Sequence, residues 1–274
     1  MLSTTGRSAR DRRPSRLRCG LWCLSALLLS GCTSGGKPTI ETPEPRIVTF
    51  PAGDETIRGF YFPPPSGPGN RPGVIVVHED YGMNEWVKAQ AHELAQQGYA
   101  VLAVDLFGGK VFTDLMDAHI MESRLDSKKV VGQLQAAVSF LSVQSGVDPD
   151  RLAILGWGSG GGYALETAIA EPRLKTVVVC YGRVPTEAKS LATLQGSVLG
   201  VFAGKDLGIS PETLAQFANA MKQAGKRLNG PHVYADLPNG FLSYIALPEP
   251  TPAQQAAVAE ARATIAKHLA EELK

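Results

Sequence analysis

Short apolar runs alternate with helical patterns along most of this chain, and that alternation constrains its fold more than any other feature. The runs typical of buried core strands are residues 74–77, 100–104, 152–155, 176–180, 198–202 and 232–235. Helical patterns lie at 85–97, 128–143, 161–170, 211–224 and 252–272. This order predicts an α/β fold, with a mostly parallel central sheet and helices on both faces. Residues 47–50 and 56–62 flank a turn-prone Pro-Ala-Gly-Asp and predict an antiparallel hairpin at the N-terminal edge of the sheet.

The first 31 residues have the order of an export signal. Six arginines against one aspartate are followed by an apolar stretch at 21–29 and by Leu29-Ser30-Gly31-Cys32. That stretch is about half the length of a membrane span. The last four residues resemble the bacterial lipobox, which implies a lipidated Cys32; an ordinary secretory signal with a chance cysteine is the alternative. We expect a signal peptide at 1–31, an acylated Cys32 with a flexible tether at 32–46, and one domain at 47–274.

This leader predicts a protein of the bacterial cell envelope, lipid-anchored and facing the periplasm. The whole chain carries a net charge of +1, and because the leader holds an excess of arginine, the body is mildly acidic. It lacks the basic pattern of a nucleic-acid-binding protein. Cys180 is the only cysteine after Cys32, so the mature chain forms no internal disulfide. We expect no metal and no cofactor; the expected partners are a small-molecule ligand or substrate and the membrane, and the oligomeric state is left open.

Four loops that follow predicted strands are the candidate functional segments. They are His78-Glu79-Asp80-Tyr81, residues 156–161, Gly204-Lys205-Asp206 and residues 237–241. In an open parallel sheet, ligands bind beyond the carboxyl ends of the strands. We therefore expect these loops to form one site.

The loops and their flanks resemble the dienelactone hydrolase family, which has the α/β-hydrolase fold. The matching segments are VIVVHEDYGMN, GYAVLAVDLFGG, VDPDRLAILGWGSGGG, VFAGKD and VYADLPNGF, in the family's order. Together they cover nearly the whole body, and four signatures in order are specific where one alone is weak. The resemblance implies an ester or lactone hydrolase with a cysteine nucleophile in Gly-x-Cys-x-Gly-Gly, a histidine before Gly-Phe and an acid in the turn ending at Asp206.

Two of those three catalytic positions depart from the family pattern. Gly158 stands at the cysteine position, and glycine has no side chain that could attack a substrate. Asn239 stands at the histidine position, and a carboxamide is no general base near neutral pH. Asp206 keeps the acid position, where we expect it to accept a hydrogen bond from Asn239 or from backbone amides.

Ser159 is the alternative nucleophile, in a register shifted by one residue. That register would put Trp157 two residues before the nucleophile, where a tight elbow needs a small side chain. In the other interpretation, Ser159 is a hydroxyl at a helix N-terminus, and its backbone amide points into the pocket.

The binding features of the family remain in the sequence. By position, the amides of Asp80 and Ser159 match the family's oxyanion-hole donors. The predicted pocket lining consists of Glu79, Tyr81, Trp157 and Phe241. Glu79 is either a pocket carboxylate or a structural one that bonds loop amides.

The sequence identifies none of the five histidines as a replacement for the missing base. His78 neighbours Glu79 on a strand and is expected to face away from the pocket. His119 belongs to the segment 114–126, which could fold over the pocket, but its direction is not fixed by the sequence. Packing or solvated roles are expected for His92, His232 and His268.

Three function hypotheses follow. The first is a catalytically impaired domain that binds a small acyl, lactone or carboxylate ligand, or a partner, at the old active-site mouth. The second is an active ester or lactone hydrolase that uses Ser159, or a water positioned by Glu79 and Asp206. The third is a structural envelope module whose cavity is filled by its own side chains.

Overall fold

The computed structural model describes residues 44–243 and 245–274. The predicted signal peptide, Cys32 and most of the predicted tether lie outside the described residues. In the described part of the chain, no helix combines the length and the apolar character needed to cross a membrane. The first strand begins at Arg46, one residue before the predicted domain boundary.

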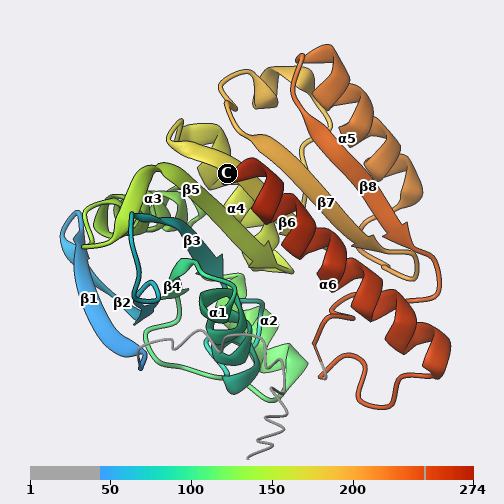
Figure 1. Ribbon diagram of the computed structural model, residues 1–274. Coiled ribbons are helices and arrows are strands. Elements are labelled where there is room, and N and C mark those ends of the chain that lie inside the picture. The colour runs from blue at the N-terminus through green and yellow to red at the C-terminus, as the bar shows by residue number, and fades with distance from the viewer. Residues whose placement is uncertain (1–43, 244) are drawn as a thin grey trace, which may run out of the picture. The chain divides into compact units, whose positions relative to one another are not determined.

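One eight-stranded sheet organises the described residues (Figure 1). Its spatial order is β1-β2-β4-β3-β5-β6-β7-β8. The edge pair β1/β2 and the pair β2/β4 are antiparallel, and all the other pairs are parallel. This confirms the mostly parallel sheet with an antiparallel N-terminal hairpin. The strands are β1 (Arg46–Ala52), β2 (Glu55–Phe62), β3 (Arg71–Val77), β4 (Ala100–Asp105), β5 (Val147–Trp157), β6 (Leu174–Cys180), β7 (Ser197–Ala203) and β8 (Leu228–Tyr234).

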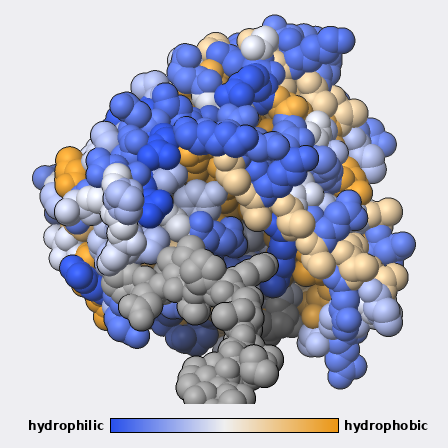
Figure 2. Space-filling model, viewed as in Figure 1, coloured by the Kyte–Doolittle hydropathy of each residue, from blue (hydrophilic) through white to orange (hydrophobic). Residues whose placement is uncertain are grey.

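Helices cover both faces of the sheet, as predicted. One face carries α1 (Glu85–Gln96) and α6 (Pro252–Glu272), and in Figure 1 α6 crosses in front of β6 and β7. The other face carries α3 (Ser127–Ser142), α4 (Ser159–Ala170) and α5 (Pro211–Gln223). A short 3₁₀ helix, η1 (Ala188–Leu191), precedes β7. In Figure 2 the outward side of α6 is a band of hydrophilic and mildly apolar residues, as expected of a solvated helix face.

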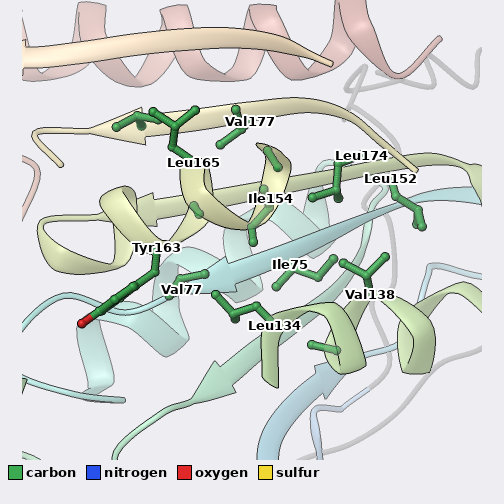
Figure 3. Close-up of a cluster of buried hydrophobic side chains, with 14 of the residues drawn as sticks. Ile75, Val77, Leu134, Val138, Leu152, Ile154, Tyr163, Leu165, Leu174 and Val177 are labelled. Carbon is green, nitrogen blue, oxygen red and sulfur yellow. The ribbon is translucent and has the colours of Figure 1, made fainter. Parts of the chain in front are cut away.

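The core has two halves, one on each face of the sheet. In Figure 3, side chains of β3 and β5 such as Ile75 and Ile154 point toward Leu134 and Val138 of α3. All four of these side chains are fully buried. Burying one such aliphatic side chain contributes about 1.5–3 kcal/mol. Continuous apolar runs form these central strands because both of their faces are covered.

The structure corrects three sequence expectations. The sequence pattern predicts no helix at 115–122 because the apolar residues there follow no helical stripe, yet α2 (Leu115–Glu122) forms. The Asp114 side chain caps it by accepting from Met116 N and Asp117 N. Strand β8 runs from Leu228 to Tyr234 rather than over 232–235. Its first half is polar, as an edge strand can be, and therefore lacks the apolar pattern that predicts a buried strand. Helix α4 begins two residues before the predicted 161, at Ser159.

Candidate active-site cleft

The turn between β5 and α4 is a sharp elbow at Gly158. Its φ is 54° and its ψ is −127°, a backbone conformation that is strained for residues with a side chain. The neighbouring glycines allow close packing: a Cβ added at Gly160 would overlap the carbonyl oxygen of His78, and one at Gly156 would overlap that of Gly160. At Gly158 itself a Cβ would lie 3.5 Å from Cβ of Glu79, an ordinary contact. Space for a nucleophile therefore remains at this position although the nucleophile is absent.

A cleft with a volume of about 360 Å³ opens at this elbow, at the carboxyl ends of the strands. It brings together the predicted site residues Asp80, Gly158, Ser159, Asp206 and Asn239. The remaining lining comes from His119 and Glu122 of α2, from Tyr181 and Arg183 after β6, and from Gly208 and Ile209. Each of the four predicted loops thus contributes to the lining of this cleft.

Asp206 and Asn239 form a closed pair in the cleft. Asn239 Nδ2 donates to Asp206 Oδ2 over 2.6 Å. The other oxygen, Oδ1, accepts from the amides of Gly208 at 2.7 Å and Ile209 at 3.2 Å. This is the hydrogen bonding expected for an acid without a histidine to orient. The carboxylate is held in place by its own loop and by the amide at the histidine position.

Glu79 is a buried carboxylate beside the elbow, with 6% of its surface exposed. Burial, and then the nearby charge of Asp80, raises its pKa to about 7, while the Ser243 hydroxyl opposes the shift. Its Oε1 has no hydrogen-bond partner among the described residues. Glu79 is therefore not held by loop amides at both oxygens, as a purely structural carboxylate would be. A group with this pKa can take up or release a proton near neutral pH.

The two predicted oxyanion-hole amides lie at the mouth of the elbow. In the described part of the chain, neither Asp80 N nor Ser159 N donates a hydrogen bond. Ser159 is the first residue of α4, whose N-terminal end carries a partial positive charge. Both amides are thus available to a carbonyl oxygen of a ligand.

His119 also lines the cleft, and the sequence did not predict the direction of its side chain. Helix α2 places its Nε2 3.3 Å from Oδ2 of Asp80, and both side chains line the cleft. Asp80 Oδ1 has no partner in the described residues. The N-cap aspartate at 114 was the one sequence signal for this helix, and it does not indicate which face would turn toward the cleft.

A second charged group at the cleft joins α2 to the residues after β6. Arg183 lies over the ring of Tyr163, with its Cζ 5.6 Å from the ring centroid, and its NH2 nitrogen is 3.5 Å from Glu122 Oε1. Tyr163 donates its hydroxyl to the same carboxylate oxygen over 3.2 Å. Burial, together with the charge of Glu122, raises the pKa of Tyr163 to about 12. Arg183 is the guanidinium of the cleft lining, and Glu122 largely balances its charge.

The predicted aromatic lining is wrong at three positions. Trp157 points to the other face of the sheet, where it packs on Trp86 at 4.9 Å and borders a separate small cavity between α1 and α6. Phe241 is buried between Tyr181 and Tyr234 and supports the cleft from below. Tyr81 is half-buried and is not among the residues that line the cleft.

Tyr181 is the aromatic residue that lines the cleft, and it was missed as a lining residue. It adopts a positive φ of 41° directly after β6. Its ring is buried against Phe241, with the two ring centroids 5.6 Å apart, so Tyr181 borders the cleft from a buried position. Side-chain alternation along β6 could not reveal this, because the backbone leaves the strand at Tyr181.

The remaining histidines and Cys180 do not line the cleft. Leu106 N donates to His78 Nε2, so the ring's proton lies on Nδ1, which donates to the Glu79 carbonyl oxygen; burial lowers the pKa of His78. His268 is buried against Thr176 at 2.7 Å. Cys180 is fully buried, and burial raises the pKa of its thiol far above neutral pH, so it is a core residue.

His92 and His232 are bonded on the protein surface, to Gln96 and Asn229. His119 is therefore the histidine of the described residues that lines the cleft. No group of three or more His, Cys, Asp or Glu side chains in residues 44–243 and 245–274 is arranged to hold a metal ion.

The sheet order, the elbow after β5 and the cleft at the strand ends define an α/β-hydrolase. The model of the dienelactone hydrolase family matches residues 57–273, and the chain belongs to that family.

Two curated relatives are 32% identical to this chain. One is the "Probable 2-oxo-3-(5-oxofuran-2-ylidene)propanoate lactonase" of a Bradyrhizobium species, over 61% of this chain and 72% of the relative. The other is a "Putative carboxymethylenebutenolidase" of Methylorubrum extorquens, over 65% of this chain and 66% of the relative.

Solved structures show the same fold. A dienelactone hydrolase-like promiscuous phosphotriesterase from metagenomic libraries superposes with a TM-score of 0.74 at 25% identity, over 84% of this chain and 99% of that one. A dienelactone hydrolase from Anabaena variabilis superposes with a TM-score of 0.61 at 21% identity, over 85% of this chain and all of that one.

Proposed function

We propose that this protein is a catalytically impaired dienelactone hydrolase-like protein that binds a small acyl or lactone ligand in the cleft. The observation that carries the proposal is the pair Asn239–Asp206, in which an amide occupies the histidine position and ties up the acid. With glycine at the elbow, the nucleophile and the base of the family are both absent. The space at Gly158 and the two amides remain. The cleft can therefore still hold a carbonyl group, although it lacks the groups for covalent catalysis.

The charges of the cleft narrow the ligand class. Asp80, Glu122 and Asp206 line the cleft, against Arg183 and His119. A free carboxylate would meet several like charges there, whereas an ester or lactone carbonyl would not. We therefore favour a neutral acyl or lactone group over the carboxylate in the initial hypothesis. A structural module filled by its own side chains is disfavoured by the volume that stays open.

We further propose that the protein is a lipid-anchored envelope protein, because the sequence around Cys32 has the lipobox order. The tether after Cys32 would let the domain reach ligands near the membrane surface. Palmitate labelling of cells that express the wild-type chain or Cys32→Ala tests this proposal. Label on the wild type that disappears in the variant supports it, and an unlabelled wild type refutes it.

Ligand binding is tested by titrating the ¹⁵N-labelled protein with γ-butyrolactone. We expect chemical-shift changes at the amides of Asp80, Ser159, Gly208 and Asn239, which border the cleft. Shift changes confined to other regions, or none at saturating lactone, would refute binding in the cleft. Backbone amides are suitable reporters here because two of them are the proposed oxyanion-hole donors.

A second candidate is a slow hydrolase that uses water or Ser159. Two observations favour it: the free Oε1 of Glu79, with a pKa of about 7, lies on a side chain next to the vacant Gly158 position, and His119 pairs with Asp80 in the same cleft. Either side chain could accept a proton from an attacking water. Asp206, the other carboxylate of that hypothesis, already accepts three hydrogen bonds. Hydrolysis of p-nitrophenyl acetate by the wild type, Ser159→Ala, Glu79→Gln and His119→Gln tests it.

A further inference from the structure

Exposed apolar side chains of the described surface gather around the mouth of the cleft. Eight large hydrophobic residues are exposed among the described residues, and four of them belong to the two segments that border the cleft, α2 and residues 206–209: Leu115, Met116, Ile120 and Leu207. Single exposed apolar residues are ordinary on protein surfaces, but a group of them beside a cavity marks a binding surface.

Helix α2 carries three of these residues: Leu115 on the face of His119, and Met116 and Ile120 on the side away from the buried Ala118. Leu115 precedes His119 by four residues, so the two share one helix face, and His119 lines the cleft. Met116 and Ile120 are also four residues apart and form the adjacent row. Met116 is 67% exposed, although nothing in its own helix requires an apolar residue there.

The other side of the cleft carries Leu207. It lies between Asp206 and Gly208, which both line the cleft, and its side chain is fully exposed. Ile209, two residues further, lines the cleft itself. Apolar groups thus stand on both sides of an opening whose floor holds Gly158 and the two free amides.

We propose that Leu115, Met116, Ile120 and Leu207, called here the apolar rim, hold the acyl chain of a ligand whose ester or lactone group lies at Gly158. The inference rests on the proposed function, because it requires that the cleft bind the carbonyl end. A chain attached to that carbonyl has to leave the cleft at the rim, where its methylenes meet aliphatic side chains. Each methylene removed from water strengthens binding about fourfold.

An acyl chain suits the rim better than an anionic membrane surface does. Helix α2 and its cap carry Asp114, Asp117 and Glu122, with no lysine or arginine among residues 114–122. An anionic membrane surface attracts basic segments and repels a helix of this charge. A single chain needs only a narrow apolar strip on each side of an opening, which is what these four residues provide.

The test compares two lactones that share a ring and differ by a hexyl chain, γ-butyrolactone and γ-decalactone, on the full-length protein. The rim variant combines Leu115→Ser, Met116→Ser, Ile120→Ser and Leu207→Ser. The matched control replaces exposed apolar residues away from the rim: Ile47→Ser, Val143→Ser and Val233→Ser. All the substituted side chains are exposed, so both variants are expected to fold, which circular dichroism checks.

We expect γ-decalactone to bind the wild type and the control at least about tenfold more tightly than γ-butyrolactone. In the rim variant the affinities for the two lactones should differ by no more than about threefold, while the affinity for γ-butyrolactone is unchanged. An unaltered ratio in the rim variant overturns the proposal and leaves the ligand-binding function intact. If neither lactone binds, the proposed function fails as well. A rim variant that keeps the ratio but loses binding to phosphatidylglycerol vesicles would show a membrane contact instead, which also overturns the proposal.

Discussion

Asn239 donates a hydrogen bond from Nδ2 to Oδ2 of Asp206 over 2.6 Å, and this contact joins the position of the family's histidine to the position of its acid. The geometry between the two loops is therefore retained while the chemistry has changed. An imidazole at this position could take a proton from a nucleophile, whereas the carboxamide only fills the acid's hydrogen-bonding capacity.

Restoring both missing groups should create activity. In Gly158→Cys with Asn239→His, the thiol would lie beside Glu79 and the imidazole would bond Asp206. We expect hydrolysis of p-nitrophenyl acetate to rise at least about a hundredfold over wild type, the usual contribution of a positioned acid–base group. The positive φ at 158 should lower stability by about 1–2 kcal/mol, measured by urea unfolding.

The single variants Gly158→Cys and Asn239→His are the controls for the double variant. Each lacks one partner, so each should stay close to wild-type turnover. A folded double variant with background activity would show that the rest of the cleft has also diverged from the family.

The contact between positions 239 and 206 predicts a pH-dependent stability. Asn239→Asp would place a second carboxylate against Asp206, and two like charges at this distance raise the pKa of one of them. Because residue 239 is exposed, we expect a loss of only about 1 kcal/mol at neutral pH, which shrinks as the pH falls through the raised pKa. Urea unfolding at neutral and acidic pH measures the difference, and Asn239→Ser, which adds no charge, is the control. A loss that does not depend on pH would contradict the repulsion.

Glu79 should lower the stability of the wild-type protein as the pH rises. Its pKa is about 7 in the folded state, against a usual value of 4.5. Between these values the folded protein holds a proton that the unfolded chain has lost, so the free energy of unfolding decreases as the pH rises through this window. The full effect above pH 7 is on the order of 3 kcal/mol. Glu79→Gln should remove it, so that the variant becomes the more stable protein at alkaline pH.

Glu85→Gln, at an exposed carboxylate of α1, is the matched control for that experiment. Unfolding free energies of the three proteins across the pH range measure the effect. Parallel curves for wild type and Glu79→Gln would contradict the buried, proton-binding carboxylate.

If the protein has residual hydrolytic activity, its base can be identified by substitution. Glu79→Gln should abolish turnover if the water lies at the Gly158 position, whereas His119→Gln should do so if the Asp80–His119 pair takes the proton. His92→Gln, at a surface histidine bonded to Gln96, is the control and should be unchanged. Activity that persists in both the Glu79 and the His119 variant excludes both side chains as the base.

The sequence predicted the central strands well because runs such as 74–77 and 176–180 are apolar on both faces and fit only a covered sheet. It also predicted that Asp206, with no imidazole to orient, would accept a hydrogen bond from Asn239 or from backbone amides, and Asp206 has both kinds of partner. The directions of individual side chains at strand ends were less accessible. Trp157 lies on the other face of the sheet, and Tyr181 borders the cleft from a buried position directly after β6.

The position of His119 could not be read from the sequence at all. Helix α2 has no clear apolar stripe, so its orientation depends on tertiary contacts such as the packing of the buried Ala118. Helix α2 supplies His119 of the Asp80–His119 pair and three of the four residues of the apolar rim.

The central claim is that the cleft binds without forming a covalent intermediate, and mass spectrometry of the protein incubated with p-nitrophenyl acetate tests it most directly. Wild type and Ser159→Ala should both show no acyl adduct in the cleft and the same background release of p-nitrophenol. An acetyl group on Ser159, with turnover that disappears in Ser159→Ala, would contradict the claim and identify the protein as a serine hydrolase.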